Sequence, residues 1–584
     1  MKKDPTTPDY VELKEDVSQS PLYSEDLAPV PPAKRTWNTW HLAFVWVGMA
    51  VCIPTYMLAS GMMRNGISWW GALLVIGLAN IVITVPMVLN GHAGVKYGIP
   101  FPVLGRAAFG VNGIHVPALL RGLVACGWFG IQTWLGGLSC YAIWNAITGM
   151  TDPPGLNAGE FIAFGVFWLI NMYFVWAGTE SIKWLEEFSA PILIVMGIAL
   201  IIWGSVTAGG FGTVLEQGKQ LERPTITWVD DRTVELHPLL TVEGQPKAHS
   251  YLLQCGPEDP GTLGAIPQGT ENVRIEGGDM LLKCENVTGH KATITLIGKA
   301  DDGSEIRSNP VALNPDDLTP GQYSGMMWTY ILAFTAMVGF WATMSLSIAD
   351  ITRFTKTQRA QVRGQFIGLP GTMILYSFVG IFVTCAALVS FDDVLAADDA
   401  PWDPVALLSR FKSPVVVVIS QIMMIIATLS TNIAANVIAP ANAISNLNPK
   451  RISFKAGATI TGILGILLCP WWIMPQVANA LIFVSGLLGP VLGVMIADYF
   501  VVRRKHLQLA ELFKQHGAYS YSNGVNMAAV LAMVLGITTA LVGYFIPSLE
   551  FLYKLSWVSG FAVAFIVYII GMRGKGAVVE SGRA

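Results

Sequence analysis

The stretch "MAVCIPTYM" (residues 49–57) places a proline inside a long apolar run. Pro54 has no backbone N–H and leaves carbonyls one turn earlier without a helical partner, so we expect a helix to be interrupted here. The surrounding run, over residues 41–63, is long enough to span a bilayer, which takes about 20 helical residues. Interrupted spans are typical of transporters whose substrate and ion sites lie at the membrane midplane.

The rest of the chain is similarly apolar. Of its 584 residues, 53% are hydrophobic and only 13% are charged, which is about half the charged fraction of a soluble domain. This composition predicts an all-α polytopic membrane protein in contact with the lipid bilayer, and we expect no nucleic-acid partner. The predicted transmembrane helices are twelve, over residues 41–63, 70–90, 116–146, 159–178, 189–208, 325–349, 367–390, 413–440, 457–475, 478–501, 526–546 and 553–572.

Charge distinguishes the connections between these spans. Alternate connections are basic, whereas "FDDVLAADDAPWD" (391–403) is acidic. Because positive loops stay in the cytoplasm, we expect a multi-pass protein of the plasma membrane, or of the inner membrane in a Gram-negative cell, with both termini cytoplasmic. The expected parts are a disordered cytoplasmic tail (1–38), helices one to five (39–214), an extracytoplasmic insert (215–322), helices six to ten (323–502), a cytoplasmic connection (503–525), helices eleven and twelve (526–573) and a cytoplasmic tail (574–584).

The insert differs in composition from the spans around it. Residues 215–322 are polar and contain short alternating runs such as "ATITLIG" (292–298), a pattern typical of strands. We predict a small all-β domain whose partner, if any, the sequence does not identify. Cys255 and Cys284 either form a disulfide in this extracytoplasmic setting or remain free thiols.

Two polar side chains lie deep in the third span. In "CGWFGIQTW" (126–134), Trp128 and Gln132 are one helical turn apart, so they present an indole and an amide on one face. Intramembrane polar residues are usually functional. The competing interpretations are that Trp128 is an interfacial anchor and that Gln132 only ties two helices together.

The sixth and eighth spans carry matching groups. "AMVGFWATMSLS" (336–347) has Gly339 beside Phe340 and Trp341, which predicts a second interruption and a second indole. The eighth span adds the amides of Asn432 and Asn436. Indoles and amides without a titratable partner favour a flat, neutral ring bearing N–H and C=O groups.

The coupling ion follows from a similar argument. The hydroxyls of Ser430 and Thr431, with the carbonyls of Ala427, Gly48 and Val51, offer five neutral oxygens. Such ligands suit Na⁺, whereas proton (H⁺) coupling, the alternative, usually needs an intramembrane acid or histidine. Taken alone, the two hydroxyls are as readily explained by hydrogen bonds to their own helix.

The placement of these features is symmetrical. If spans one to five and six to ten are two repeats, the interrupted helices correspond, and so do the polar third and eighth spans. This predicts an inverted-repeat (five plus five) transporter core with two additional helices.

At these residues the chain resembles the nucleobase:cation symporter-1 family, which includes cytosine, uracil, purine, thiamine, allantoin and hydantoin permeases. The resemblance is carried by stretches including "NGHAGVKYGIPFPVLGRAAFG" (90–110), "PALLRGLVACGWFGIQTW" (117–134), "FWATMSLSIADITRF" (340–354), "TNIAANVIAPA" (431–441) and "GPVLGVMIADYF" (489–500). It implies that the ring lies between Trp128 and Trp341, that Gln132 and Asn436 bind it, and that the five oxygens above hold Na⁺. Cys52 stands where close relatives carry an amide, which puts an allantoin or hydantoin preference in doubt.

The sequence therefore predicts a sodium-coupled symporter that imports a nucleobase or cyclic ureide by alternating access, and not an enzyme. The alternative is a membrane receptor for such a ring, with the insert as its partner module. No metal-ligand cluster, cofactor motif or P-loop is recognisable in the sequence.

Overall fold

The computed structural model describes residues 10–64, 67–150, 156–177, 179–217, 326–390 and 403–574, together with short strands between residues 225 and 313. The longer helices are α1 (Thr39–Ala50), α2 (Ile53–Arg64), α3 (Trp69–Tyr97), α5 (His115–Thr148), α6 (Ala158–Ala177), α7 (Thr179–Thr207), α9 (Met326–Ser347), α11 (Gln358–Ser390), α13 (Pro414–Asn436), α15 (Phe454–Leu467), α17 (Val477–Ile496), α18 (Met527–Phe545) and α20 (Ser556–Gly571). Shorter helices are α4 (Phe101–Phe109), α8 (Phe211–Gln217), α10 (Ala349–Thr352), α12 (Pro404–Ser409), α14 (Ile438–Ser445), α16 (Pro470–Ile473) and α19 (Glu550–Lys554), and the 3₁₀ or π turns are η1 (Pro32–Lys34), η5 (Met474–Gln476), η6 (Ala497–Val502), η7 (Ala510–Phe513) and η8 (Pro547–Leu549).

The first apolar run breaks where the sequence predicts. α1 ends at Ala50, α2 begins at Ile53, and the two helices are bent by 63° at this break. Pro54 lies in the first turn of α2, a position where a helix needs no donor from its backbone. The proline therefore starts the second half of the span, and Val51 and Cys52 form the unwound link.

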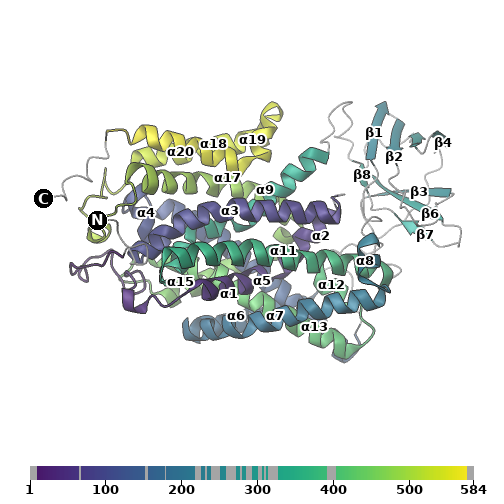
Figure 1. The fold of residues 1–584 in the computed structure, drawn as a ribbon, viewed down its shortest axis with the longest axis horizontal. Helices are drawn as coiled ribbons and strands as arrows, with labels where there is room; N and C mark the ends of the chain where they lie inside the picture. Colours follow the sequence, from purple (N-terminus) through teal and green to yellow (C-terminus); the bar gives the residue numbers. More distant parts are fainter. Residues whose placement is uncertain are drawn as a thin grey trace.

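The helices form one elongated bundle (Figure 1). α1 packs against α11 and α13, α5 packs against α13 and α6, and α9 packs against α3 and α17. α18 and α20 pack on α17 and form one side of the bundle. The described chain begins and ends at the same end of the bundle, at the left in Figure 1, which we call the terminal end.

The expected second interruption is absent at Gly339. α9 continues through this residue and ends at Ser347. A methyl group at Gly339 would lie 2.7 Å from the carbonyl oxygen of Leu481 in α17 and would collide with Ser485. The glycine therefore permits close packing of two helices, and the prediction of a break at this position is wrong.

In the predicted fold class, the number of twelve transmembrane helices needs correction. Each predicted span overlaps a helix, but among the described residues eight helices are long and apolar enough to cross a membrane, or up to ten if each bent pair is one span. α5 is not among them, since its Trp, Gly and Gln residues lower its hydropathy, and α15 is a shorter apolar helix. The second bent pair joins η8 and α19 to α20 at 84°.

The predicted all-β domain also needs correction. The backbone is assigned to strands β1 (Thr225–Asp230), β2 (Thr233–His237), β3 (Ser250–Pro257), β4 (Glu271–Glu276), β5 (Asp279–Lys283), β6 (Ala292–Lys299), β7 (Glu305–Arg307) and β8 (Val311–Leu313). They pair antiparallel in the orders β1-β2-β5-β4 and β3-β6-β7, with β8 beside β6. A β domain is defined by a buried core between its sheets, and the side chains of these strands lie outside the described residues. The part of the protein with a described core is all-helical.

The segment before α1 lies along the terminal end. Val30 N–H donates to the Gly98 carbonyl at 2.8 Å, and Trp37 N–H donates to the Phe354 carbonyl at 3.0 Å. Leu27 is fully buried. The sequence predicts a disordered tail over residues 1–38, but residues 10–38 are ordered in the structure because their apolar side chains pack against the bundle.

Candidate functional site

The predicted aromatic residues lie in one cluster between α1, α5 and α9. Trp128 contacts Phe340 with ring centroids 5.2 Å apart, and Phe340 contacts Trp341 at 4.9 Å. Trp341 in turn contacts Trp46 of α1 at 5.2 Å. All three contacts are edge-to-face, so the two expected indoles are linked through Phe340. Sequence reasoning missed Trp46, although it is the one tryptophan in the first apolar run (41–63).

Polar atoms in this cluster lack protein partners. Gln132 Oε1 and the indole Nε1 groups of Trp341 and Trp46 are buried and make no hydrogen bond within the described part of the chain. A buried polar atom without a partner is costly, by about 1–3 kcal/mol. These atoms can therefore serve a ligand that offers a hydrogen-bond donor to the amide oxygen and an acceptor to the indoles.

Cys52 lies at the same place, on the unwound link. Its thiol lies beside the side chains of Gln132 and Thr431 and shares a hydrogen bond of 3.3 Å with the Thr55 hydroxyl. A thiol is a weak hydrogen-bonding group, so at this position it contributes shape more than specific recognition.

The two asparagines of α13 have different surroundings. The Asn432 amide donates to Thr133 Oγ1 at 3.1 Å and to Asn171 Oδ1 of α6 at 3.0 Å. Asn436 donates to Asn432 Oδ1 at 3.1 Å. Asn432 therefore ties three helices together, and Asn436 is the better placed of the two to meet a ligand. Asn171 was missed, although it is the only amide inside the fourth predicted span.

The predicted cation ligands meet where α1 ends against α13. Ser430 Oγ donates to the Gly48 carbonyl at 3.3 Å, and Thr431 Oγ1 lies 3.1 Å from the Gly48 carbonyl and 3.2 Å from that of Met49. The last carbonyls of a helix carry the negative end of its dipole. This oxygen cluster fits a hard monovalent cation, which in broken-helix transporters is bound by unwound carbonyls and helix C-terminal ends.

Two oxygens of this cluster were not anticipated by the sequence reasoning. Ser189 of α7 donates to Ser430 Oγ at 3.0 Å and adds an oxygen that was missed, and the Met49 carbonyl takes part. The carbonyls of Val51 and Ala427 remain predicted ligands. Ser189 opens the fifth predicted span shortly before Pro191, which is the only signal that pointed to it.

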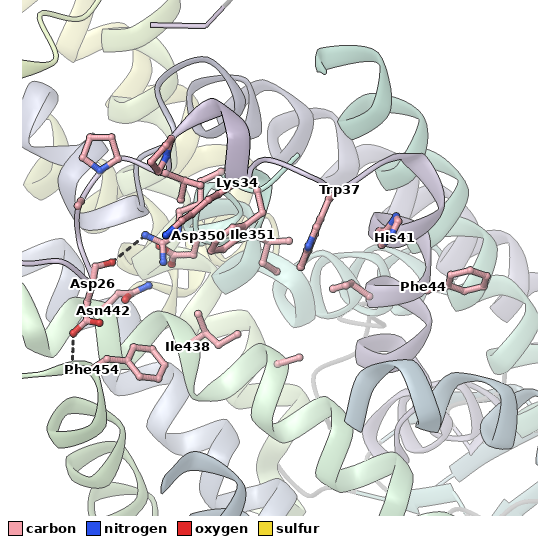
Figure 2. A pocket seen from close by; sticks show the side chains of 18 of the residues that line it. Asp26, Lys34, Trp37, His41, Phe44, Asp350, Ile351, Ile438, Asn442 and Phe454 are labelled. Carbon is pink, nitrogen blue, oxygen red and sulfur yellow. Dashed lines mark hydrogen bonds between the residues drawn. The ribbon is translucent and has the colours of Figure 1, made fainter. Parts of the chain in front are cut away.

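A large cavity lies between this region and the terminal end. Its volume is about 1320 Å³, and its wall includes Ala434 of α13 as well as residues of α1, α7, α10, α14 and the segment before α1. Figure 2 shows Asp350 and Asn442 near Asp26, with Trp37 and His41 farther along the cavity. The cavity thus connects the neighbourhood of the oxygen cluster with the terminal end.

Buried charges lie near this cavity, which the sequence reasoning did not anticipate. Arg121 of α5 is fully buried and donates to Ser347 Oγ at 2.9 Å. Asp350 of α10 accepts a hydrogen bond from Phe101 N–H at 3.0 Å. Burial raises the pKa of the Asp350 carboxyl to about 6, although the guanidinium groups of Arg353 and Arg121 lower it. Both residues lie near the ends of predicted spans, where a charged side chain is ordinarily taken to mark the end of the span rather than a functional group.

One prediction, the disulfide, is not addressed by this geometry. Cys284 and the side chain of Cys255 lie outside the described residues, so a disulfide between them stays a prediction. Among the described residues, no group of three or more His, Cys, Asp or Glu side chains could hold a metal ion.

Comparisons with known proteins identify the family of the chain. A family model described as "permease for cytosine/purines, uracil, thiamine, allantoin" matches residues 29–229 and 284–560. The allantoin permease of Bacillus subtilis is 32% identical, over 96% of this chain and 96% of its own. The purine-uracil permease of Arabidopsis thaliana is also 32% identical, over 94% of this chain and 74% of its own.

Solved structures share the fold. The nucleobase-cation-symport-1 family transporter Mhp1, in a closed conformation with bromovinylhydantoin bound, matches with a TM-score of 0.66 at 22% identity over 95% of this chain and 96% of its own. Its inward-facing conformation matches with a TM-score of 0.65. This shared fold is an all-helical polytopic one, which overturns the inserted all-β domain in the predicted fold class.

The extent of these matches settles the class of the protein. The family model covers more than half of the chain, and its members are permeases. The predictions that the protein is a transporter and that it is not an enzyme are therefore confirmed, and the alternative of a receptor is wrong. The chain belongs to the family of permeases for cytosine, purines, uracil, thiamine and allantoin.

Proposed function

We propose that this permease carries a neutral planar ring, a nucleobase or a cyclic ureide, bound at the cluster of Trp128, Phe340, Trp341 and Gln132. The observation that carries the proposal is a pair of buried polar atoms beside aromatic rings, Gln132 Oε1 and Trp341 Nε1, which have no partner in the described part of the chain. A ring with adjacent N–H and C=O groups satisfies both atoms. The names of the relatives, which include allantoin and purine-uracil permeases, support this substrate class.

The coupling ion we propose is Na⁺, bound by the Gly48 and Met49 carbonyls with the hydroxyls of Ser430, Thr431 and Ser189. These oxygens carry no formal charge, and a small monovalent cation accepts such a set. Coupling by H⁺ is the second candidate. It is favoured by one observation, the buried Asp350 carboxyl with its raised pKa.

Coupling follows from the shared position of the two sites. Thr431 lies at the oxygen cluster and also beside Cys52, which in turn lies beside Gln132. An ion that holds the end of α1 against α13 fixes the unwound link next to the ring. Each ligand then favours binding of the other by the same factor, and movement of α1 and α2 relative to α13 provides alternating access.

We further propose that the terminal end faces the cytoplasm of a plasma membrane. Lys34, Arg353, Lys450 and Arg503 all lie in segments at this end, and basic segments remain cytoplasmic. The large cavity then opens toward the cytoplasm and forms the route by which the ring leaves. The assignment of residues 1–38 and 503–525 to the cytoplasmic side belongs to the same proposal.

The experiment is uptake by purified protein in liposomes. Radiolabelled uracil, cytosine, hypoxanthine, allantoin and a benzylhydantoin are each tested with an inward Na⁺ gradient, an inward proton gradient or neither. We expect one compound or a narrow set to accumulate only with Na⁺. Accumulation driven by the proton gradient alone would overturn the ion assignment, and accumulation of none of the five would overturn the substrate class.

A further inference from the structure

A second layer of polar side chains lies across the helices that form the ring site. Arg121 lies seven residues before Trp128 in α5, Asn442 lies six residues after Asn436 in α13 and α14, and Asp350 lies ten residues after Phe340. At 1.5 Å per helical residue these offsets are about 9–15 Å, all toward the terminal end. The fold therefore holds two polar levels, and Asn442 and Asp350 of the second level line the large cavity.

Atoms of the second layer lack partners in the protein. Asn442 is fully buried and its side chain lies beside the Asp350 carboxylate, yet neither its amide nitrogen nor its amide oxygen has a partner in good hydrogen-bond geometry within the described residues. Asp350 is 2% exposed, and its Oδ2 accepts none. Arg353 Nε, on the same wall, donates none. Buried polar groups are almost always paired, so four such atoms on one cavity wall point to a polar ligand.

The geometry of these atoms defines the ligand's chemistry. Asn442 offers one donor and one acceptor, which pair with the N–H and C=O of a ring amide. Asp350 Oδ2 accepts from a second N–H, and Arg353 Nε donates to a second carbonyl. The aromatic residues Trp37 and Phe454 line the same cavity and supply apolar surface for a flat molecule.

We propose that this cavity contains a second binding subsite, formed by Asn442, Asp350 and Arg353, for the same neutral ring that the first site carries. The inference rests on the proposed function for the identity of the ring. The subsite holds the ring after it leaves Trp128 and Gln132 and before it reaches the cytoplasm. Ala434 lines the cavity and lies between Asn432 and Asn436 in α13. The cavity therefore reaches the first site, and the ring can pass directly from one position to the other.

The charges around the cavity favour a neutral ligand over an ion. Lys34 and Arg353 are cationic, whereas Glu25, Asp26 and Asp350 are acidic. Asp26 is already engaged, because its carboxylate accepts from Phe454 N–H at 3.0 Å and its carbonyl accepts from Arg353 at 3.1 Å. With both signs present on the walls, neither an anion nor a cation is strongly favoured.

The test counts bound rings per chain. Full-length protein in detergent with Na⁺ is titrated to saturation with radiolabelled uracil, allantoin or benzylhydantoin by equilibrium dialysis. For the compound that is taken up, we expect two rings per wild-type chain and one per chain for Asn442→Leu, with the remaining dissociation constant within about twofold of the tighter wild-type value. Gln132→Leu should lose the other site and also bind one ring.

Two variants make the result decisive. Asn80→Leu is the matched control, because Asn80 is also a buried asparagine with an unpaired amide oxygen but lies in α3, away from the cavity; it should bind two rings. If Asn442→Leu does not fold, Asp350→Asn replaces it in the test. This variant keeps the oxygen that accepts from Phe101 N–H and should weaken binding at the second site about tenfold.

The outcomes separate this inference from the proposed function. One ring per wild-type chain, or two rings for Asn442→Leu, would overturn the second subsite and leave the transporter assignment intact; the cavity would then be a water-filled exit path. Binding of none of the three compounds by the wild-type chain would overturn the proposed substrate class and the subsite together.

Discussion

At the scale of single residues, Gln132 is the most informative side chain of the ring site. It is buried in α5, and its amide oxygen has no partner in the described protein. A site built to hydrogen-bond a substrate discriminates strongly against a ligand that cannot pair with it. The amide should therefore contribute to affinity more than any aromatic contact beside it.

We expect Gln132→Leu to reduce the apparent affinity for the transported ring by about 5-fold to 150-fold, the effect of about 1–3 kcal/mol for a lost buried hydrogen bond. Initial uptake rates over a range of ring concentrations measure this change. Ser139→Ala is the control, since Ser139 is buried two turns farther along α5 and its hydroxyl is also unpaired. Equal affinities for Gln132→Leu and the wild type would remove Gln132 from the site.

Thr431 allows the ion site to be tested with a conservative change. Its hydroxyl lies near the carbonyls of Gly48 and Met49, so Thr431→Ala removes an oxygen ligand whereas Thr431→Ser retains it. We expect the alanine variant to need at least about tenfold more Na⁺ for half-maximal uptake and the serine variant to resemble the wild type. Na⁺ activation curves of ring uptake report the difference. An unchanged curve for Thr431→Ala would place the ion elsewhere.

Some residues of the proposed sites could be identified from the sequence, and others could not. Trp128, Gln132, Ser430 and Thr431 could be singled out because polar or amphipathic side chains deep in apolar runs are rare. Ser189 could not, because its approach to Ser430 depends on how α7 packs against α13. Contacts of this kind arise from tertiary structure and leave no pattern along the chain.

At the scale of elements, the two expected interruptions illustrate what a pattern can and cannot predict. Pro54 forces a break because it lacks a donor, and the structure has the bend of 63° there. Gly339 only permits a break, and it is used for close contact between α9 and α17. Proline acts through covalent geometry, whereas the role of a glycine depends on its neighbours.

The contact at Gly339 predicts the effect of a single methyl group. Gly339→Ala would push α9 away from the Leu481 carbonyl and shift Phe340 and Trp341 in the ring site. We expect ring uptake to fall by at least about tenfold, because overpacking of a tight contact costs about 1–3 kcal/mol. Gly371→Ala in α11 is the matched control, since nothing lies within 4 Å of the added methyl. Wild-type uptake by Gly339→Ala, at equal protein yield, would contradict this role for the α9–α17 contact.

At the scale of the whole molecule, the helical membrane-protein architecture followed from composition and hydropathy, but the number of spans did not. The third predicted span is α5, whose polar and small residues, Gln132 among them, make it less apolar than an ordinary span. The alternating pattern in residues 215–322 was over-interpreted as a domain, because strand patterns are local and a domain requires a core. The ordered segment over residues 10–38 was missed since its stability comes from packing on the bundle.

In the proposed mechanism, ring and ion move together through adjacent sites. The most direct measurement is uptake of radioactive Na⁺ into liposomes that contain the purified protein, with and without the transported ring outside. We predict that the ring stimulates Na⁺ uptake in fixed proportion to its own uptake, and that Thr431→Ala weakens this coupling at low Na⁺ concentration. Entry of the ring with no accompanying Na⁺ would contradict the account.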